Sequence, residues 1–420
     1  MKPLLTLAWH SAWSRRFVLS LTVMSVALST FLLLSIERIR VDVHDKFSQT
    51  VSGTDLIVGP RTGSVQLLLY AVFRIGQATN NMAYSSVQAL AKHRAVAWVV
   101  PISLGDSHRG FPVVATTSAY FQHYQHGEHQ PLVLAQGKPF AGLFDAVIGS
   151  EIAQRLGYKL GTHLVLSHGD GALEGNDHTD KPFVVTGILQ ATGTPVDRSV
   201  HIGLAAMEAI HLDWVGGAPL PGLHITQDQL ATADLTPRNV TAVLVGLKSR
   251  AAVFAVQRWV ADNDQEPLMA VLPGVALDEL WEVVGVGERA LLAVTGLVAL
   301  VSVAGLVATI LAGLNERRRE LAILRAIGAG PRFMWLLLAT EGALVTLIGA
   351  GLGAATSVLA ATLLHDWGQQ RFGITLHGGW PHGNQWLMLG SVLLFGWLAS
   401  LLPGWRAFRL SLIDGLTPKV

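Results

Sequence analysis

The stretch Asn315–Pro331, NERRRELAILRAIGAGP, decides the predicted fold because of what lies on either side of it. It joins two long apolar runs, Ala290–Leu314 and Phe333–Leu364. Its apolar residues recur every three to four positions, which predicts a short amphipathic helix that ends at Gly328 and Pro331. Between two membrane spans, such a helix lies at the membrane surface with its charged face toward water. A plain loop whose arginines only fix the topology is the alternative.

Two further apolar runs bring the number of predicted spans to four. Phe17–Leu34 has eighteen residues without a charge, and Trp386–Leu402 is the last run. A cleaved signal peptide is the alternative for the first, but cleavage near Ser29 would leave apolar residues at the new N-terminus. Lys and Arg gather in three segments on one side of this topology: Lys2–Arg16, Arg317–Arg332 and Arg406–Lys419. The positive-inside rule makes that side cytoplasmic, together with both termini.

Small residues in the spans predict close packing between helices. Ala304, Ala308 and Ala312 recur at every fourth position, and Gly349 and Gly353 form a GxxxG pair. Such residues let two backbones approach closely, so we expect these faces to contact neighbouring helices.

Residues 37–287, between the first and second spans, alternate short β-rich runs with amphipathic helices, which is typical of an α+β domain. Strand candidates are Leu56–Val58, Ala97–Val100, Pro112–Ala115, Ala146–Ile148, His163–Leu166, Phe183–Ile188 and Ala242–Val245. Helix candidates are Ser85–Lys92, Glu151–Leu156 capped by Ser150, Ala205–His211, and Arg250–Asp262 capped by Ser249. Gly149–Leu189 indicates a compact β unit, so we expect two subdomains. Val65–Phe73 is too short to span a membrane and should be buried, with an exposed apolar surface as the alternative.

Composition and missing motifs exclude several function classes. Half of the 420 residues are hydrophobic and only 14% are charged, fewer than in a soluble enzyme of this length. A net charge of +1 argues against nucleic-acid binding. Without cysteine, the external domain must fold without disulfides. Asp55–Ser64 lacks the spacing and the lysine of a phosphate-binding loop, and neither a Walker motif nor a catalytic motif occurs elsewhere. We therefore expect a non-catalytic chain whose energy comes from a separate ATPase.

Fifteen of the sixteen histidines fall on the predicted external side, and some are candidate metal ligands. His123, His126 and His129 lie within FQHYQHGEHQ, and the first two would share a helical face if Tyr120–His126 were helical. Because imidazoles and carboxylates bind zinc, we assign these three as a tentative zinc site. Scattered solvated histidines are the alternative.

A second pair of histidines is also notable. His168 and His178 flank an acidic, glycine-rich segment, GDGALEGND. Imidazoles and carboxylates are zinc ligands, so this pair offers the same ligand chemistry.

The stretch ERRRELAILRAIGA resembles the cytoplasmic coupling segment of MacB/FtsX-type (LolC/E-like) ABC transporter permeases. Pro403–Leu416 is similar to the family's C-terminal tail, although Leu412 stands where many members have proline. DAVIGSEIAQRLGYKLGTHLVL and FVVTGILQATGTPVDRSVHIGL resemble the family's periplasmic core domain. The resemblance therefore covers nearly the whole chain.

This resemblance implies an α-helical membrane protein with four transmembrane helices and a large α+β extracytoplasmic (periplasmic core) domain between the first and second spans. With the patterns above, the expected parts are a cytoplasmic N-terminus 1–16, spans 17–36, 288–314, 332–364 and 385–403, an external domain 37–287, a coupling helix 315–331, an external loop 365–384 and a cytoplasmic tail 404–420.

The resemblance also implies a function and partners. The chain would be the permease subunit of an ABC transporter in a bacterial inner (plasma) membrane, beside an ABC ATPase dimer and a second permease copy or paralogue. ATP and Mg would bind to the ATPase, and we expect no cofactor in this chain unless the histidines hold zinc. The residues implied in coupling to the ATPase are Glu316, Arg318, Glu320, Leu321, Leu324, Arg325, Ala326 and Gly328.

The implied work is extrusion of a lipoprotein, peptide or small molecule, or mechanotransmission to a periplasmic or outer-membrane partner. An FtsX-like regulator of a cell-wall hydrolase, which transports nothing, is one alternative. A component of a metal (zinc)-linked transport system is the other.

Overall fold

The computed structural model describes residues 16–50, 52–76, 78, 80–169, 177–215, 218–219, 227–316, 328–365, 367–368 and 378–409. The chain divides into two compact units. We call Met1–Val43 with Val284–Val420 the membrane unit, and His44–Val283 the external unit.

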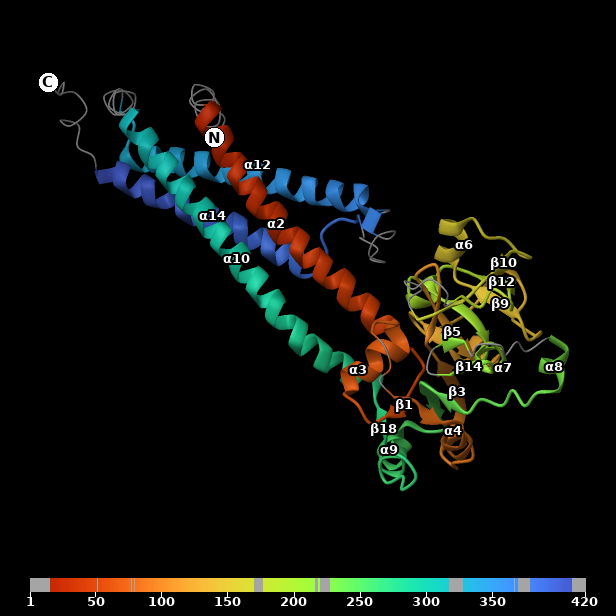
Figure 1. Cartoon of the computed structure of the whole chain (residues 1–420). Coiled ribbons are helices and arrows are strands. Elements are labelled where there is room, and N and C mark those ends of the chain that lie inside the picture. The colour runs from red at the N-terminus through yellow and green to blue at the C-terminus, as the bar shows by residue number, and fades with distance from the viewer. Residues whose placement is uncertain are drawn as a thin grey trace. The chain divides into compact units, whose positions relative to one another are not determined.

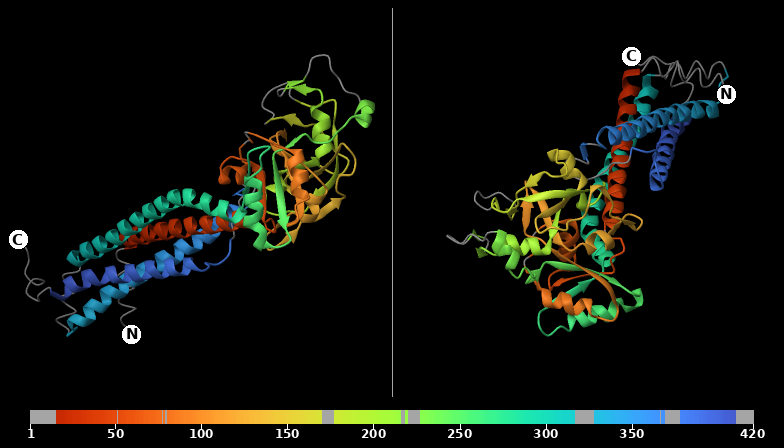
Figure 2. Two further views of the ribbon diagram at one scale, coloured as in Figure 1. Left: turned by 90° about the horizontal axis from the view of Figure 1, so that it is seen from below. Right: turned by 90° about the vertical axis from the view of Figure 1, so that its right-hand side faces the viewer.

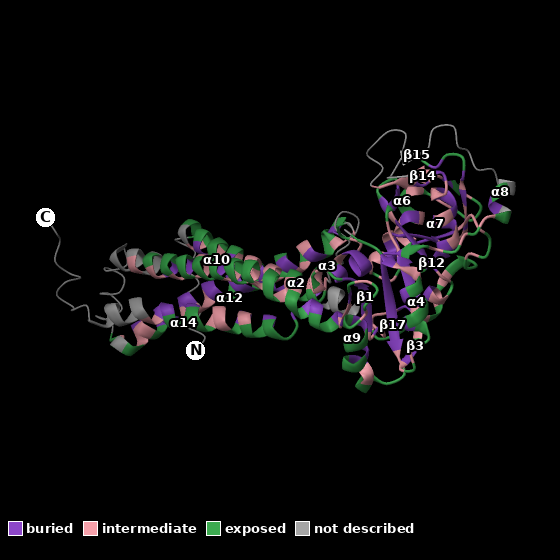
Figure 3. Cartoon of the chain, turned by 60° about the horizontal axis from the view of Figure 1, so that its bottom comes forward, coloured by how far each residue is buried: buried purple, intermediate pink, exposed green. Residues whose placement is uncertain are grey.

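Four long apolar helices form the framework of the membrane unit (Figure 1). They are α2 (Arg16–Gln49), α10 (Pro273–Glu316), α12 (Pro331–Leu363) and α14 (Asn384–Arg409). Each is long and apolar enough to cross a membrane. Most of their apolar surface faces outward, and on α10 only 17% of the most apolar window is buried (Figure 3). An α+β domain lies between the first and second of these helices, so the predicted fold class is confirmed.

Glycines place α12 against α2. A Cβ added at Gly353 would lie 2.5 Å from the backbone oxygen of Ala27, and one at Gly349 would lie 2.8 Å from Cβ of Val26. With any larger residue at these two positions, the backbone of α12 could not approach α2 so closely. The two glycines therefore lie at a helix–helix contact within the membrane unit.

The alanines expected at a helix contact of α10 do not lie on the face of α10 that packs within this chain. Ala304 and Ala308 are exposed in this chain, and the side chain of Ala312 lies outside the described residues. Ser302 and Leu306 are buried instead, and Ser302 Oγ lies 3.0 Å from Ser25 Oγ of α2. Two residues along a helix turn a side chain by about 200°, so the alanine face points away from the face that packs.

A large β-sheet forms the centre of the external unit, which Figure 2 shows from two further sides. It has twelve strands, and its main path runs in the order β10-β12-β9-β13-β5-β3-β17-β1-β18. The strands on this path are β1 (Leu56–Pro60), β3 (Val96–Ser103), β5 (Phe111–Thr116), β9 (Asp145–Ile148), β10 (His163–Leu164), β12 (Phe183–Leu189), β13 (Val200–Gly203), β17 (Ala242–Leu247) and β18 (Leu268–Val271). Beside it lie β4 (Asp106–His108), β8 (Leu134–Gly137) and β11 (Ser167–His168). All seven strand candidates overlap these strands.

The expected β unit Gly149–Leu189 does not form a sheet of its own. It supplies β10, β11 and β12, of which β11 pairs with β4 and β12 pairs in parallel with β9, so the hydrogen-bonded ladder continues beyond it. Farther along the sheet, β3 and β5 share two described residue pairs, Ile102 with Thr116 and Ser103 with Ala115. The external unit is one compact unit, with the expected β unit as part of its single large sheet.

Alternating side chains give the sheet two apolar faces. Leu56 and Val58 belong to one buried cluster, while Ile57 between them belongs to the other, as the two-residue period of a strand requires. The helices α4 (Tyr84–Ala91), α6 (Ser150–Leu156), α7 (Leu204–His211) and α9 (Val253–Ala261) match the predicted ones closely. Val65–Phe73 forms α3 (Ser64–Leu68) and the π-helical η1 (Leu69–Phe73), and its larger side chains are buried as expected.

One predicted cap is wrong and one is present. Ser249 Oγ accepts a hydrogen bond from Ala251 N at 3.4 Å, as expected, at the start of η3 (Arg250–Ala252). At α6, Gly149 rather than Ser150 occupies the N-cap position. A Cβ there would collide with the backbone oxygen of Asp197, so only glycine fits at the N-cap. The helix begins at Ser150, one residue earlier than predicted.

Short elements complete the external unit. They are β2 (Met82–Ala83), α5 (Ala119–His123), β6 (Gln125–His126), β7 (Gln130–Pro131), η2 (Pro195–Arg198), β14 (Trp214–Val215), β15 (Ala218–Pro219), α8 (Gln227–Thr232) and β16 (Asn239–Val240).

Candidate functional site

Most of the predicted coupling segment lies outside the described residues. Helix α10 ends at Glu316, whose side chain is not described, and the predicted contacts Arg318, Glu320, Leu321, Leu324, Arg325 and Ala326 all fall beyond it. Gly328 has a φ of 101°, a conformation that favours glycine, and α12 begins with Pro331 at its first position. The glycine and the proline thus turn the chain into the third long helix.

The histidines of FQHYQHGEHQ are not arranged as predicted. Helix α5 ends at His123, and His126 lies in β6, so the two do not share a helical face. Gly127, with a φ of 55°, turns the chain from β6 to β7. The ring of His123 stacks on Trp98 with 4.9 Å between centroids, and His129 Nδ1 lies 3.2 Å from Gln125 Oε1. The shared-face argument for zinc at these residues is therefore wrong.

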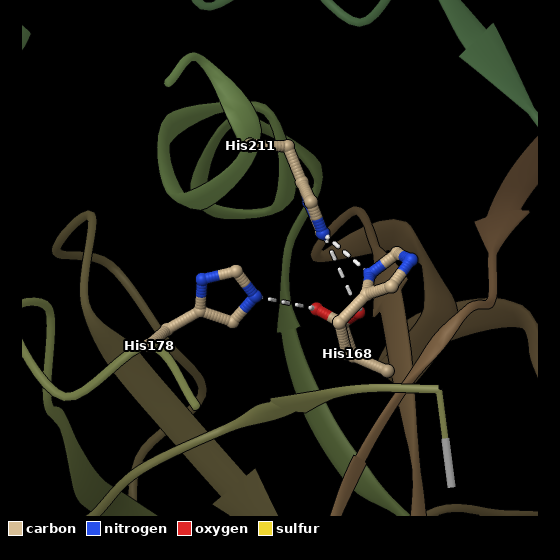
Figure 4. Close-up of side chains that lie close together, drawn as sticks. His168, His178 and His211 are labelled. Atoms are coloured by element: carbon tan, nitrogen blue, oxygen red, sulfur yellow. Dashed lines mark hydrogen bonds and ion pairs between the residues drawn. The ribbon is translucent and has the colours of Figure 1, made fainter. Parts of the chain in front are cut away.

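Four other side chains converge instead. Of the described residues, Asp106, His168, His178 and His211 form the group whose ligand atoms all lie within 4.8 Å of one another. We call this group the histidine–aspartate cluster. Figure 4 shows the rings of His168, His178 and His211 pointing toward a common centre.

The fold brings these residues together from four places in the chain. Asp106 on β4 and His168 on β11 are paired across an antiparallel ladder, which places their side chains on the same face. His211 is the last residue of α7. His178 follows a bridge between Asp177 and Ser167, and its backbone N–H donates to Leu166 O at 2.8 Å.

The distances between the polar atoms of the cluster fall in a narrow range. His168 Nδ1 lies 3.1 Å from both Asp106 Oδ1 and His211 Nε2. His211 Nε2 lies 3.4 Å from Asp106 Oδ1. His178 Nε2 lies 3.9 Å from Asp106 Oδ2, which is too far for a hydrogen bond.

Two members of the cluster are deeply buried and incompletely paired. The side chains of Asp106 and His178 have no exposed surface. Within the described parts of the chain, neither ring nitrogen of His178 has a hydrogen-bond partner, and neither has Asp106 Oδ2. A buried polar group left without a partner costs about 1–3 kcal/mol.

Burial and the carboxylate act against each other on the pKa values. Burial alone would raise the pKa of Asp106, but hydrogen bonds from His168 and His211 hold it below its ordinary value. Burial lowers the pKa of His178 to about 4, against the attraction of Asp106. Burial would also lower the pKa of His211, but its hydrogen bond to Asp106 raises it instead. The folded domain therefore favours an ionised Asp106 beside a neutral His178.

An aromatic ring and an ion pair border the cluster. The ring centroid of Trp214 lies 4.4 Å from that of His178 and 5.6 Å from that of His168. Beside them, the buried Lys181 Nζ donates to both carboxylate oxygens of Asp213, at 3.0 and 2.9 Å. Trp214 thus packs against two rings of the cluster, and the carboxylate of Asp213 is already paired with Lys181.

A fourth histidine nearby does not belong to the cluster. His108 lies on β4, but its Nδ1 is 2.6 Å from Val165 O and its Nε2 is 2.9 Å from Tyr158 Oη. Both of its nitrogens are thus occupied by hydrogen bonds.

Sequence reasoning found only half of this cluster. His168 and His178 stand out beside their acidic segment, but Asp106 and His211 lie tens of residues away and have no spacing that marks them. The β4–β11 pairing and the end of α7, which are tertiary features, bring them into place.

Two family matches cover most of the chain. The family described as "MacB-like periplasmic core domain" matches residues 19–262, more than half of the chain, and "FtsX-like permease C-terminal" matches residues 292–412. The chain belongs to the FtsX/MacB-type ABC transporter permeases. The family resemblance found in the sequence is therefore confirmed. Members of this family are non-catalytic permease subunits that generally work with an ABC ATPase.

Two solved structures that are similar to this FtsX/MacB-type permease are extracytoplasmic regions. The periplasmic region of MacB from Actinobacillus actinomycetemcomitans is 10% identical, with a TM-score of 0.33, over 55% of this chain and 94% of that one. The extracellular domain of the noncanonic ABC-type transporter YknZ from Gram-positive bacteria is 15% identical, with a TM-score of 0.30, over 52% of this chain and 98% of that one. No curated protein matches the chain.

Proposed function

We propose that this permease transmits ATP-driven motion from a separate ATPase to its external unit, rather than forming a pore for small solutes. The observation that supports this role is the continuity of α10. The helix runs unbroken for 44 residues, from Pro273 in the external unit to Glu316 beside the predicted coupling segment. At about 1.5 Å per residue it is roughly 66 Å long, about twice the thickness of the hydrocarbon layer. A helix of this length can carry a displacement from one end to the other.

The charge distribution supports the orientation of the chain. Lys and Arg flank the spans at both termini and around Arg317–Arg332. By the positive-inside rule this supports an orientation with these parts in the cytoplasm and the external unit in the periplasm of a bacterial inner membrane. A reporter fused after Asn263 should be active only outside the cytoplasm, and one after Gly328 only inside. Cytoplasmic activity at Asn263 would refute this orientation.

In the proposed mechanism, an ATPase dimer closes on ATP beneath Glu316–Gly328. The motion passes along α10, and the external unit shifts against a second permease copy or paralogue. This motion could drive the extrusion of a lipoprotein, peptide or small molecule, or it could regulate a cell-wall hydrolase. ATP-dependent movement of a substrate into or out of vesicles would distinguish transport from regulation without transport.

The role of α10 can be tested by breaking the helix. Val286 is 63% exposed, so Val286→Pro removes a helical hydrogen bond without emptying a packed site, and Val286→Ala is the matched control. Because the chain has no cysteine, Arg250→Cys gives a single labelling position on the external unit. In nanodiscs with the co-purifying ATPase, the label should respond to ATP in Val286→Ala but not in Val286→Pro. An equal response in both variants would show that α10 does not transmit the motion.

A further inference from the structure

We propose that Asp106, His168, His178 and His211 bind one divalent transition metal ion of the zinc type in the external unit. The donors are one oxygen of Asp106, Nδ1 of His168, Nε2 of His178 and Nε2 of His211. Three imidazoles and a carboxylate, without thiolate, suit zinc in preference to calcium or magnesium, which take oxygen ligands.

The distances match a tetrahedral centre. Metal–ligand distances of about 2.0–2.1 Å in a tetrahedron place neighbouring ligand atoms about 3.3 Å apart. With Asp106 Oδ1 as the oxygen ligand, the ligand atoms of Asp106, His168 and His211 lie 3.1, 3.1 and 3.4 Å apart, close to that value. All four ligand atoms of the cluster lie within 4.8 Å of one another, and His178 Nε2 lies 3.9 Å from the second carboxylate oxygen, Oδ2. The chain itself supplies all four positions, so the site is of the closed, structural kind and leaves no position for a catalytic water.

The unpaired atoms of the cluster point to the same conclusion. Hydrogen bonds among His168, His211 and Asp106 Oδ1 can satisfy those three groups on their own. They do not satisfy the wholly buried His178, whose ring nitrogens both lack a partner among the residues described. A metal ion at the common centre would use Nε2 of His178 and remove the cost of burying it unpaired.

A hydrogen bond to the other ring nitrogen of His211, and the partial exposure of two of the histidines, also suit metal binding. His211 Nδ1 lies 2.8 Å from the backbone oxygen of Met207, so Nδ1–H donates there and Nε2 is the nitrogen available to bind an ion once it gives up its proton to solvent. The side chains of His168 and His211 are 32% and 24% exposed, which gives an ion access from solvent. A bound ion would then tie β4, β11, α7 and the segment at His178 to one another.

The test uses the full chain, purified in detergent with a histidine-free tag and stripped of metal with a chelator. Titration with Zn²⁺ against a chromophoric chelator should show one equivalent bound with sub-micromolar affinity. Asp106→Asn and His178→Gln keep the side-chain volume, and each should weaken binding at least tenfold. Co²⁺ should give the intense visible bands of a tetrahedral site, and these should disappear in His178→Gln.

The matched control removes the same number of imidazoles elsewhere. The triple variant His123→Ala, His126→Ala, His129→Ala should bind Zn²⁺ as the wild type does. Circular dichroism confirms that each variant is folded. Absence of micromolar binding in the wild type would overturn the proposal. So would loss of binding in the triple variant while Asp106→Asn and His178→Gln keep it.

Discussion

His178 Nε2 lies 3.9 Å from Oδ2 of Asp106, with both side chains wholly enclosed and no hydrogen bond between them. Direct hydrogen bonding would bring the two atoms to about 3 Å. The gap instead resembles the edge of a metal polyhedron, in which two ligands are attracted to an ion and not to each other. If the proposed ion binds, the stability of the external unit should differ with and without metal.

Replacing His178 by leucine should have opposite effects on the two forms. Without metal, His178→Leu removes a buried polar group that has no partner in the described structure, so unfolding of the external unit should cost the same or up to about 2 kcal/mol more. With zinc at 100 times its Kd, the wild type gains about 2.7 kcal/mol and the variant does not. Thermal unfolding with chelator and with Zn²⁺ measures both values. A variant less stable than the wild type in chelator would contradict the unpaired state of His178.

His201 should make the external unit less stable in mild acid. Complete burial, reinforced by the charge of Arg74, lowers the pKa of His201 to about 3. The unfolded chain, with a histidine pKa near its ordinary value of about 6.5, then takes up a proton that the folded state does not. The stabilisation is complete above pH of about 6.5 and is lost as the pH falls toward 3, by at most about 1.4 kcal/mol per pH unit.

The matching measurement for His201 is denaturant unfolding between pH 7 and 5 in chelator. His201→Phe, which keeps an aromatic ring beside Tyr120, should flatten the dependence on pH. An unchanged slope would mean that His201 is protonated in the folded protein.

Two glycines of α12 should respond differently to the same substitution. Gly353→Leu would force a side chain into the backbone of α2 near Ala27 and cost about 1–3 kcal/mol through overpacking. Gly351→Leu is the control, because a Cβ there meets no atom of the described chain within 4 Å. Thermal unfolding in detergent should show a lower midpoint for Gly353→Leu alone. Equal midpoints would mean that α12 and α2 do not pack through Gly353.

The coupling helix predicted for Glu316–Gly328 should depend more on its apolar side and helical form than on its charges. Leu324→Asp introduces a charge on the apolar side, and Ala326→Pro costs about 3 kcal/mol in a helix interior. Both variants should still insert but fail to stimulate the ATPase or to co-purify with it.

Single charge removals in the same segment should be milder. Glu320→Ala and Arg325→Ala should reduce stimulation slightly and in a salt-dependent way, because exposed ion pairs contribute about 0–1 kcal/mol. Normal stimulation by both Leu324→Asp and Ala326→Pro would leave the segment with a topogenic role only.

The sequence was sufficient for the elements but not for the cluster. Long uncharged runs such as Phe333–Leu364 and alternating runs such as Phe183–Ile188 carry their structure in local periodicity, and both were found. The packing face of α10 was harder to predict, because hydropathy does not show whether the face that carries Ala304 contacts another helix.

The candidate metal ligands show more clearly what the sequence alone does not reveal. His123 and His126 are close in sequence, but the end of α5 and the turn at Gly127 separate them. Asp106 and His168 are far apart in sequence, but strand pairing makes them neighbours. Closeness in sequence therefore gave the wrong set of candidate ligands, because strand pairing and turns determine which side chains lie together.

The pairing of β4 with β11 also limits how this protein can change over evolutionary time. The ladder aligns Ser107 with Ser167 and Asp106 with His168, and side chains alternate between its two faces. Residues added to an exposed loop between the two strands would leave this alignment in place. One residue added inside either strand would turn His168 away from Asp106 and separate two of the four ligands, even if every amino acid of the cluster were retained.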